Sequence, residues 1–368
     1  MNLPAADTLS TLDTLDVEGQ RVLVRLDFDV AEQQPEAIAL QVDRALPTLH
    51  HLLAKRARVI VASHVAGASG ETPPSLESAG AALAEKLNCD VLLPDDVVGD
   101  MARKITAELR TGQVAILENL AREPGELAND LAFAQQLAGL CDAFVNEAPS
   151  LFDHKLASTI HLPRRVPARA LGLDSVRVAQ GLRTLQLQRE QLIAIVAASQ
   201  INFNTLDHLQ RWLPRVRTLL VVSEAESVVQ ALRPPSKAGA GASKDRADEL
   251  VSRCRTLHEQ ARASSKKLIA CQGAQLAQTL GQLGAGTASA PLLLVGPVAN
   301  AGVDLESLGT VLGGRPVVGA FGVPVLLSLQ RSPTLFAHVP LACASETVAL
   351  RALSGEALPS LAALTGVG

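Results

Sequence analysis

Polar and charged side chains follow four apolar runs in the first half of the chain, where buried strands are expected to end. Acid, imidazole and amide groups bind ligands or move protons when a fold gathers them at one place. The carboxyl ends of parallel strands meet at one edge of a sheet, so we expect these groups to line one crevice. The alternative, which is favoured for any one of these residues taken alone, is that it caps the next helix. The segments are Asp27-Phe28-Asp29, Ser63-His64, Glu118-Asn119 and Asn146-Glu147.

Two apolar runs in the second half end in segments that contain glycine. Backbone N–H groups in such turns form small nests that bind anions. We therefore take Gly296, Pro297 and Gly319 as candidate cofactor-binding residues, within Gly-Pro-Val-Ala and Gly-Ala-Phe-Gly segments. No Gly-x-x-x-x-Gly-Lys-Ser/Thr sequence occurs, which excludes a P-loop.

Short apolar runs alternate with stretches of helical periodicity, a pattern typical of βαβ units around a parallel sheet. The alternation occurs twice, on either side of a charged, Gln-rich stretch at residues 176–191. The expected fold class is α/β, with two Rossmann-like, doubly wound parallel-sheet domains facing a cleft. Strands are predicted at residues 21–27, 58–63, 90–93, 113–117 and 142–145, and then at 192–196, 218–222, 267–271, 291–295 and 315–319.

Composition excludes several classes of protein. The 368 residues are 48% hydrophobic and 19% charged, with a formal net charge of −4, which is unlike a disordered chain. Without basic runs or tyrosine, and with one tryptophan, we expect neither a nucleic-acid nor a membrane partner. The five cysteines are scattered and show no zinc-ligand spacing, so we predict no metal site, reduced thiols and a cytoplasmic location.

Several longer motifs carry a family likeness through their order and spacing. Residues 15–30 read Leu-Asp-Val-Glu-Gly-Gln-Arg-Val-Leu-Val-Arg-Leu-Asp-Phe-Asp-Val, and residues 353–364 read Leu-Ser-Gly-Glu-Ala-Leu-Pro-Ser-Leu-Ala-Ala-Leu. Between them come Ala45-Leu-Pro-Thr48, Ser63-His64, Leu117-Glu-Asn119, Gly125-Glu126, Asn129-Asp130, Val145-Asn146 and Ala157-Ser-Thr159. On these segments the chain resembles the phosphoglycerate kinase family from its beginning to its end.

The resemblance implies two domains that close about a hinge. The N-terminal domain would bind 3-phosphoglycerate through a basic patch, and the C-terminal domain would bind Mg-ATP or Mg-ADP. With the strand pattern, it predicts an N-terminal domain at residues 1–172, a connecting helix at 173–190 and a C-terminal domain at 191–345. Residues 346–368 would return to the first domain as a tail. A monomer is expected, because the family is usually monomeric.

The chain differs from the family at the positions where the substrate-binding domain of the family has arginine. Cations are needed because charge spreads over the transferred phosphoryl oxygens and the substrate's own anionic groups. The positions that hold arginine in the family are Gln41, Gly67, Ala121 and His154. Four such hydrogen bonds are worth roughly 6–12 kcal/mol if additive, an upper range. Asp27, Asp29, His64, Arg122 and His154 remain as candidate substrate-binding residues.

The nucleotide half departs as far from the family pattern. Gln200 and Asn204 stand at lysine positions, so no confident catalytic residue remains at either Gln41 or Gln200. The ribose-contacting glutamate and the magnesium-linked aspartate of the family become Gly302 and Gly322. Glu346 replaces a glycine of the last glycine-rich turn, where its charge would repel a phosphate. We therefore expect no cofactor, and Mg-ATP or Mg-ADP only if the protein is a working kinase.

Three functional hypotheses follow from these residues. The first is a catalytically degraded relative with a binding or regulatory role and a small-molecule ligand in the interdomain cleft. The second is a working phosphoglycerate kinase whose cations have moved to Arg44, Arg122 and Lys155. The third is a structural partner of other metabolic proteins with no ligand in the cleft.

The acid-and-imidazole corner of Asp27, Asp29 and His64 gives one electrostatic expectation. With the arginines replaced, the two carboxylates would make the local potential negative and raise the pKa of His64. The alternative is that both acids cap backbone donors while His64 packs between strands.

Overall fold

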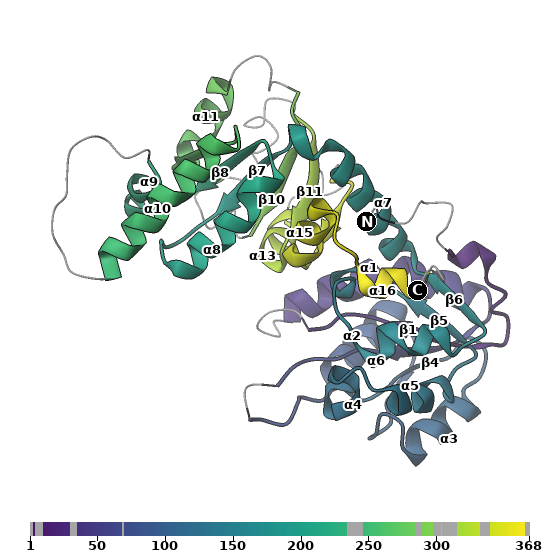
Figure 1. Cartoon of the computed structure of the whole chain (residues 1–368). Helices are drawn as coiled ribbons and strands as arrows, with labels where there is room; N and C mark the ends of the chain where they lie inside the picture. Colours follow the sequence, from purple (N-terminus) through teal and green to yellow (C-terminus); the bar gives the residue numbers. More distant parts are fainter. Residues whose placement is uncertain are drawn as a thin grey trace. The chain divides into compact units, whose positions relative to one another are not determined.

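The structure is a computed structural model that describes residues 3, 10–29, 35–67, 70–233, 246–283, 289–296, 303, 315–331 and 339–364. The chain divides into two compact units, each of which is described by itself. The first contains residues 1–180 and 355–368, and the second contains residues 181–354. Figure 1 shows the elements of both units with their labels.

The first unit contains a six-stranded sheet in the order β3-β4-β2-β1-β5-β6, and every pair in it is parallel. Its strands are β1 (Arg21–Arg25), β2 (Arg58–Ala62), β3 (Val91–Leu92), β4 (Val114–Ile116), β5 (Ala143–Asn146) and β6 (Ala168–Leu171). Its helices are α1 (Pro35–Ala54), α2 (Glu77–Leu87), α3 (Asp100–Glu108), α4 (Pro124–Leu127), α5 (Leu131–Ala138), α6 (Ala157–Ile160) and α16 (Pro359–Ala362). Helix α7 (Leu173–Gln188) begins in this unit and continues into the second.

The second unit repeats the design with a six-stranded parallel sheet in the order β12-β11-β10-β7-β8-β9. Its strands are β7 (Ile193–Ala197), β8 (Thr218–Val222), β9 (Lys267–Cys271), β10 (Leu292–Val295), β11 (Val317–Phe321) and β12 (Ala342–Cys343). Its helices are α8 (Phe203–Trp212), α9 (Glu226–Ala231), α10 (Arg246–Ala263), α11 (Leu276–Gln282), α13 (Val323–Gln330) and α15 (Glu346–Ser354). The predicted α/β class with two parallel-sheet domains is confirmed.

The strand orders place a topological switch point in each sheet. In the first unit the chain runs outward from β1 through β2 and later crosses to β5 on the other side of β1. In the second unit it runs from β7 through β8 and β9, then crosses to β10. Ligands of such sheets bind beyond the carboxyl ends of the strands at this reversal. The groups after β1 and β5, and after β7 and β10, are therefore the ones to examine.

Apolar strands buried on both faces hold each sheet in place. Val22, Leu23 and Val24 of β1 have no exposed surface, and β7 and β8 are equally apolar runs. Parallel strands covered by helices on both faces need such continuous runs, which explains why sequence alone locates most of them. Trp212 at the end of α8 is among the largest fully buried side chains.

The end of the chain packs on the first unit through a short helix. Ser360 at the second position of α16 donates its backbone N–H to the Phe152 carbonyl at 3.2 Å and its hydroxyl to the Leu151 carbonyl at 3.1 Å. Leu361 beside it is 1% exposed. Residues 346–354, which the sequence analysis assigned to the tail, form helix α15 of the second unit.

Several elements differ from their predicted bounds for local reasons. The strand predicted at 315–319 is β11, Val317–Phe321. The four-residue strand β6 and the two-residue strand β12 were not predicted, since runs this short carry little periodicity.

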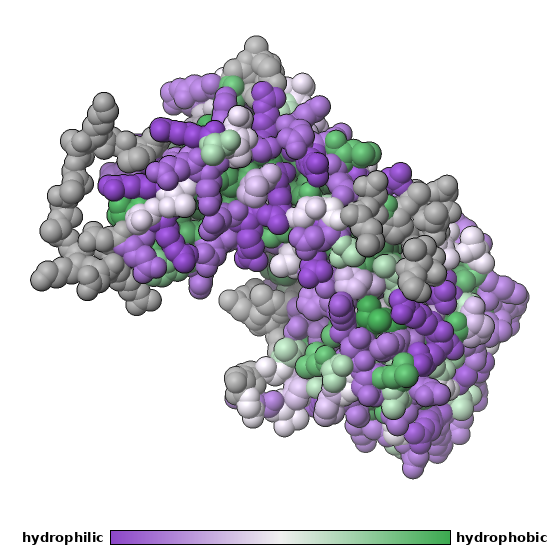
Figure 2. Space-filling view, in the orientation of Figure 1, coloured by the Kyte–Doolittle hydropathy of each residue, from purple (hydrophilic) through white to green (hydrophobic). Residues whose placement is uncertain are grey.

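The face of the molecule in Figure 2 is predominantly hydrophilic, and apolar residues form small, separate groups on it among polar ones. Leu187 of α7 is an exposed apolar residue, at 80% exposure. Within the described ranges, no helix is both long and apolar enough to cross a bilayer.

We expect Leu361→Ala to destabilise the first unit by about 2–4 kcal/mol, because the truncation leaves a cavity under α16. The matched control is Leu187→Ala, which removes the same atoms from an exposed position. Urea unfolding followed by circular dichroism measures both variants, with the control within about 0.5 kcal/mol of wild type. Equal stability of the two variants would show that α16 contributes no packing.

Candidate functional site

A fully buried arginine organises the carboxyl edge of the first sheet. Arg25, the last residue of β1, is 0% exposed. Its Nη2 donates to Nδ1 of His64 at 2.7 Å and lies 3.4 Å from the carboxylate of Glu126, itself 0% exposed. Its Nε donates to Ser158 Oγ at 2.9 Å, and Nη1 donates to the Leu26 carbonyl. The guanidinium thus joins the ends of β1 and β2 to helices α4 and α6.

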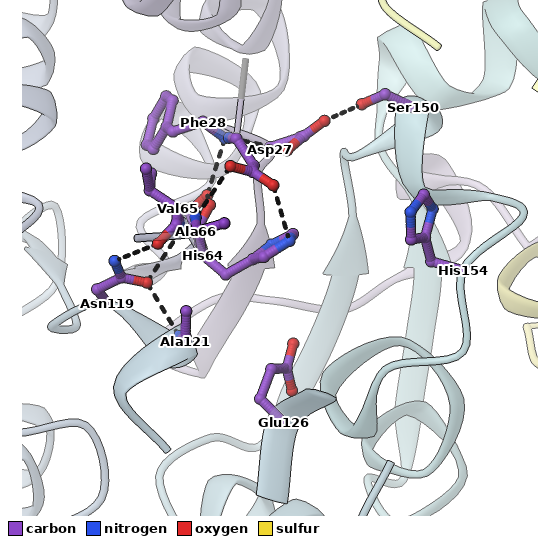
Figure 3. A network of polar contacts seen from close by, with 12 residues as sticks. Asp27, Phe28, His64, Val65, Ala66, Asn119, Ala121, Glu126, Ser150 and His154 are labelled. Atoms are coloured by element: carbon purple, nitrogen blue, oxygen red, sulfur yellow. Dashed lines mark hydrogen bonds and ion pairs between the residues drawn. The ribbon is translucent and has the colours of Figure 1, made fainter. Parts of the chain in front are cut away.

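Two aspartates follow β1, and Figure 3 shows Asp27 bonded to Ser150, with the ring of His64 nearby. Asp27 is buried, accepts the hydroxyl of Ser150, and also accepts the Asp29 backbone N–H at 3.1 Å. Asp29 accepts the backbone N–H of Ala66 at 2.9 Å, and its Oδ2 lies 3.6 Å from His64 Nε2. Asp29 thus lies beside His64, and both acids also accept backbone N–H groups.

The expected protonation of His64 is wrong. Its pKa falls from the ordinary 6.5 to about 3. The main cause is burial of the ring, and the positive charges of Arg25 and His154 disfavour a further positive charge on it. Arginine has only donors, so Nδ1 of His64 must accept and the ring proton sits on Nε2, facing Asp29. Burial also raises the pKa of Asp27, against the opposing effects of Ser150 and Arg25.

Arg122 lies at the edge of the neighbouring loop. Its Nη1 donates to Glu118 at 3.0 Å and its Nε donates to the Pro73 carbonyl. Glu118 also accepts the Leu76 backbone N–H at 3.0 Å, while Asn119 bonds both backbone groups of Val65. These contacts hold the loop after β2 against the end of β4. Arg122 donates to groups of both segments.

His154 stands apart from the hydrogen-bonded corner, on the segment beyond Ser150 (Figure 3). Its Nδ1 is 3.0 Å from Asp153, and that hydrogen bond is the main reason that its pKa is raised. The negative charges of Asp27 and Asp29 raise it further. An exposed imidazole therefore supplies a titrating positive charge at the position that holds arginine in the family.

The remaining family cation positions of this unit carry neutral groups. Gln41 is half-buried on α1, and Ala121 is half-buried and donates its N–H to Asn119. A Cβ at Gly67 would lie 3.0 Å from the Glu71 carbonyl oxygen and 3.2 Å from the backbone of Pro73. The loop backbone itself occupies the space beside position 67.

A second buried carboxylate caps the start of α7. Glu147, after β5, accepts the Thr48 hydroxyl at 2.5 Å and the backbone N–H groups of Asp174 and Ser175 at 3.1 and 2.9 Å. Burial and the charge of Asp174 raise the pKa of Glu147 to about 7. Asp174 in turn binds Arg44 at 2.7 Å.

In the second unit, the glycine candidates take different places from one another. Gly296 follows β10 with φ +73° and lies at the switch point, whereas Pro297 falls outside the described residues. Gly319 lies inside β11, where an added Cβ would be 3.0 Å from the Leu293 side chain. The expected nest at Gly319 is thus wrong, and Gly322, with φ +100°, ends the strand instead.

The lysine positions of this half hold exposed amides. Gln200 is exposed after β7 and Asn204 lies in the first turn of α8. Glycine 302 lies outside the described residues.

The side chain of Glu346 lies in the space beyond β10 and β11, next to Gly296 and Gly322. Its Oε1 lies 2.9 Å from where a Cβ of Gly322 would be and 3.8 Å from that of Gly296. Its Oε2 is 3.4 Å from Nε2 of His208 on α8. Burial raises the pKa of Glu346 to about 7, against the charge of Arg211, and burial lowers that of His208 to about 4.

These positions do not fit the phosphates of a Mg-nucleotide. A protein carboxylate already lies beyond β10 and β11, and the lysine positions after β7 carry no charge. Among the described residues, no group of three or more His, Cys, Asp or Glu is placed to hold a metal ion.

Arg25 and Ser150 were not predicted as site residues, although the sequence around Arg25 contains an indication of its role. An arginine inside the apolar run Arg21–Arg25 requires a buried acid partner, and Glu126 lies within one of the quoted motifs. Nothing local in the sequence connects Ser150 to Asp27, or His208 to Glu346.

Comparisons with known proteins place this chain in a family. The family model described as phosphoglycerate kinase matches residues 12–291, so the chain belongs to the phosphoglycerate kinase family. The phosphoglycerate kinase of Anaeromyxobacter sp. (strain Fw109-5) is 36% identical over 201 residues, which cover 53% of this chain and 51% of that protein. That of Salinispora tropica is 38% identical over 226 residues, covering 58% and 56%. The matches thus span about half the length of these relatives.

Two solved structures share the fold across nearly the whole chain. Phosphoglycerate kinase from Coxiella burnetii is 21% identical, with a TM-score of 0.70, and covers 97% of this chain and 99% of its own. Phosphoglycerate kinase from Pyrococcus horikoshii OT3 is 17% identical, with a TM-score of 0.78, and covers 97% and 98%. At these identities the likeness concerns the fold alone.

We expect His64 to remain neutral between pH 8 and pH 5, with a pKa of about 3, while His154 titrates above its ordinary 6.5. Because the folded pKa of His64 lies below the unfolded value, this group destabilises the protein as pH falls from about 6.5 towards 3. Imidazole NMR titration measures both rings. In the matched variant Asp153→Asn the pKa of His154 should fall and His64 should stay neutral. A His64 that titrates near 6.5 in the folded protein would contradict the geometry.

We expect Arg25→Met to cost about 3–5 kcal/mol of unfolding free energy, because it leaves the buried carboxylate of Glu126 without its cation. Adding Glu126→Gln should recover at least about 1 kcal/mol, since a neutral amide still accepts the Ser158 N–H. Urea unfolding of wild type, both single variants and the double variant closes the cycle. Strictly additive losses would mean that the two charges do not interact.

Proposed function

We propose that this member of the phosphoglycerate kinase family does not transfer phosphoryl groups and acts instead by binding or regulation. The observation that carries the proposal is the use of arginine in the first unit. Arg25, Arg44 and Arg122 lie next to the strand ends, and each donates to protein groups. Phosphoryl transfer depends on cations that stabilise the charge spread over the transferred group.

The backbone at Gly67 supports the proposal independently. Contacts of 3.0–3.2 Å from an added Cβ to the Glu71 and Pro73 backbone mean that a longer side chain there requires the loop to move. Restoring the family's arginine by the single change Gly67→Arg is therefore insufficient. One lost transition-state donor costs about two to three decades in rate, and four family positions are affected here.

The second candidate function is a working phosphoglycerate kinase with relocated cations. The observation that favours it is the exposed His154, whose pKa the charges of Asp27 and Asp29 raise, followed in the chain by the exposed Lys155. In that function His154 in its protonated form, with Lys155, would receive the anionic substrate.

The remaining expectations belong to the same proposal. A small polar molecule would bind at the strand ends of the first unit, where neutral His64 adds no positive charge. We propose a monomer in the cytoplasm without nucleic-acid or membrane partners, on the strength of the composition, the scattered free cysteines and the family.

A coupled assay with 3-phosphoglycerate and Mg-ATP tests the proposal, with a phosphoglycerate kinase relative run alongside. We expect no turnover above background at any protein concentration, and no saturable NMR shifts with 3-phosphoglycerate at sub-millimolar concentration. The control variants are Lys155→Ala and His154→Ala, prepared identically. Turnover in the wild type that both variants lose would establish the second function, because a contaminating kinase would be unaffected by them.

A further inference from the structure

The carboxylate of Glu346 lies where the second sheet would receive a ligand. Gly296 ends β10 at the switch point, and Gly322 ends the adjacent strand β11. Their missing side chains leave space beyond the strands, and Glu346 Oε1 fills it, 2.9 Å from the Cβ position of Gly322. An added Cβ at Gly296 would also lie 4.0 Å from the Ala197 carbonyl oxygen at the end of β7. The carboxylate therefore reaches the place where the two central strands end.

Two features of the surroundings favour negative charge on this carboxylate, although burial outweighs them. Helix α13 starts directly after Gly322, and α15 starts at Glu346 itself, so the positive ends of two helices meet there. His208 Nε2 lies 3.4 Å from Oε2, and the guanidinium of Arg211, also on α8, lowers the pKa of Glu346 by its charge. Burial is the largest effect on this group and raises its pKa to about 7 against them. The structure thus shows a side chain that fills the space between two helix starts, with burial disfavouring its ionised form.

We propose that Glu346 is an internal plug, an autoinhibitory contact that occupies the anion position at the switch point of the second unit and excludes external anions from it. This inference rests on the proposed function, because it gives the physical reason that the second unit would fail to bind a nucleotide phosphate. It goes beyond a repelling charge, because the side chain takes up the volume as well.

Matched variants distinguish exclusion of anions by the volume of the Glu346 side chain from exclusion by its charge. Glu346→Ala removes both the volume and the charge, whereas Glu346→Gln removes the charge and keeps the volume. Glu259→Ala on α10 removes an exposed acid of the same unit and serves as the control. The probe is inorganic sulfate, which keeps its two negative charges across the pH range used. Calorimetry and the thermal shift of the full chain report binding at pH 8.

We expect no saturable sulfate binding below about 10 mM for wild type, Glu259→Ala and Glu346→Gln. Glu346→Ala should bind at least tenfold more tightly than wild type, a difference of about 1.4 kcal/mol. If Glu346→Ala is folded by circular dichroism and gains no affinity, the plug is refuted. Equal gains in Glu346→Gln and Glu346→Ala would also refute it, because charge alone would then explain exclusion.

The kinase assay separates this inference from the proposed function. Wild type without turnover, together with no gain in Glu346→Ala, would refute the plug and leave the proposed function standing. Wild type with turnover that depends on Lys155 and His154 would refute the proposed function. Saturable binding of Mg-ADP to the wild type at micromolar concentration would refute the plug, because the position would then be open.

Discussion

The buried ion pair between Arg25 and Glu126 constrains the arrangement of the first unit's strand ends. Both side chains are 0% exposed, so each needs the other and further hydrogen bonds to offset the loss of water. Ser158 donates its N–H and hydroxyl to Glu126, and Arg25 reaches His64 at the end of β2. One guanidinium thus fixes the positions of β1, β2, α4 and α6 relative to one another. Burial of the His64 ring and, after it, the same positive charge lower the pKa of His64.

Sequence reasoning recovers the parts of this molecule that depend on continuous apolar runs. Strands β8 and β9 lie at the residues predicted, and Asp29 lies beside His64 because the strands before them, β1 and β2, are neighbours. The sign of the His64 pKa shift was not predictable, because it depends on burial and on where a long arginine side chain points. The misplaced start of β11 has another cause: Arg315 and Pro316 precede an apolar run that extends to Phe321.

In both units, side chains of the protein itself lie at the strand ends beside the topological switch point. In the first, Ser150 beyond β5 donates to Asp27 beyond β1, which joins the two strand ends that flank the reversal. In the second, Glu346 lies over the glycines that follow β10 and β11. Parallel sheets concentrate unsatisfied groups at this edge, and a ligand usually satisfies some of them. Here intramolecular contacts meet part of that demand.

The proposed separation of family membership from chemistry in this chain has a physical basis. The sheets are stabilised by buried strands such as β1 and β7, whose packing is independent of the residues that follow their carboxyl ends. An exchange of arginine for glutamine at position 41, on half-exposed surface, leaves that packing intact. Substitutions at the edge therefore change what the fold binds at little cost to whether it folds. Arg25 is the opposite case, because its charge is buried and paired with that of Glu126. Replacing it therefore disturbs the packing of the first unit as well as the site.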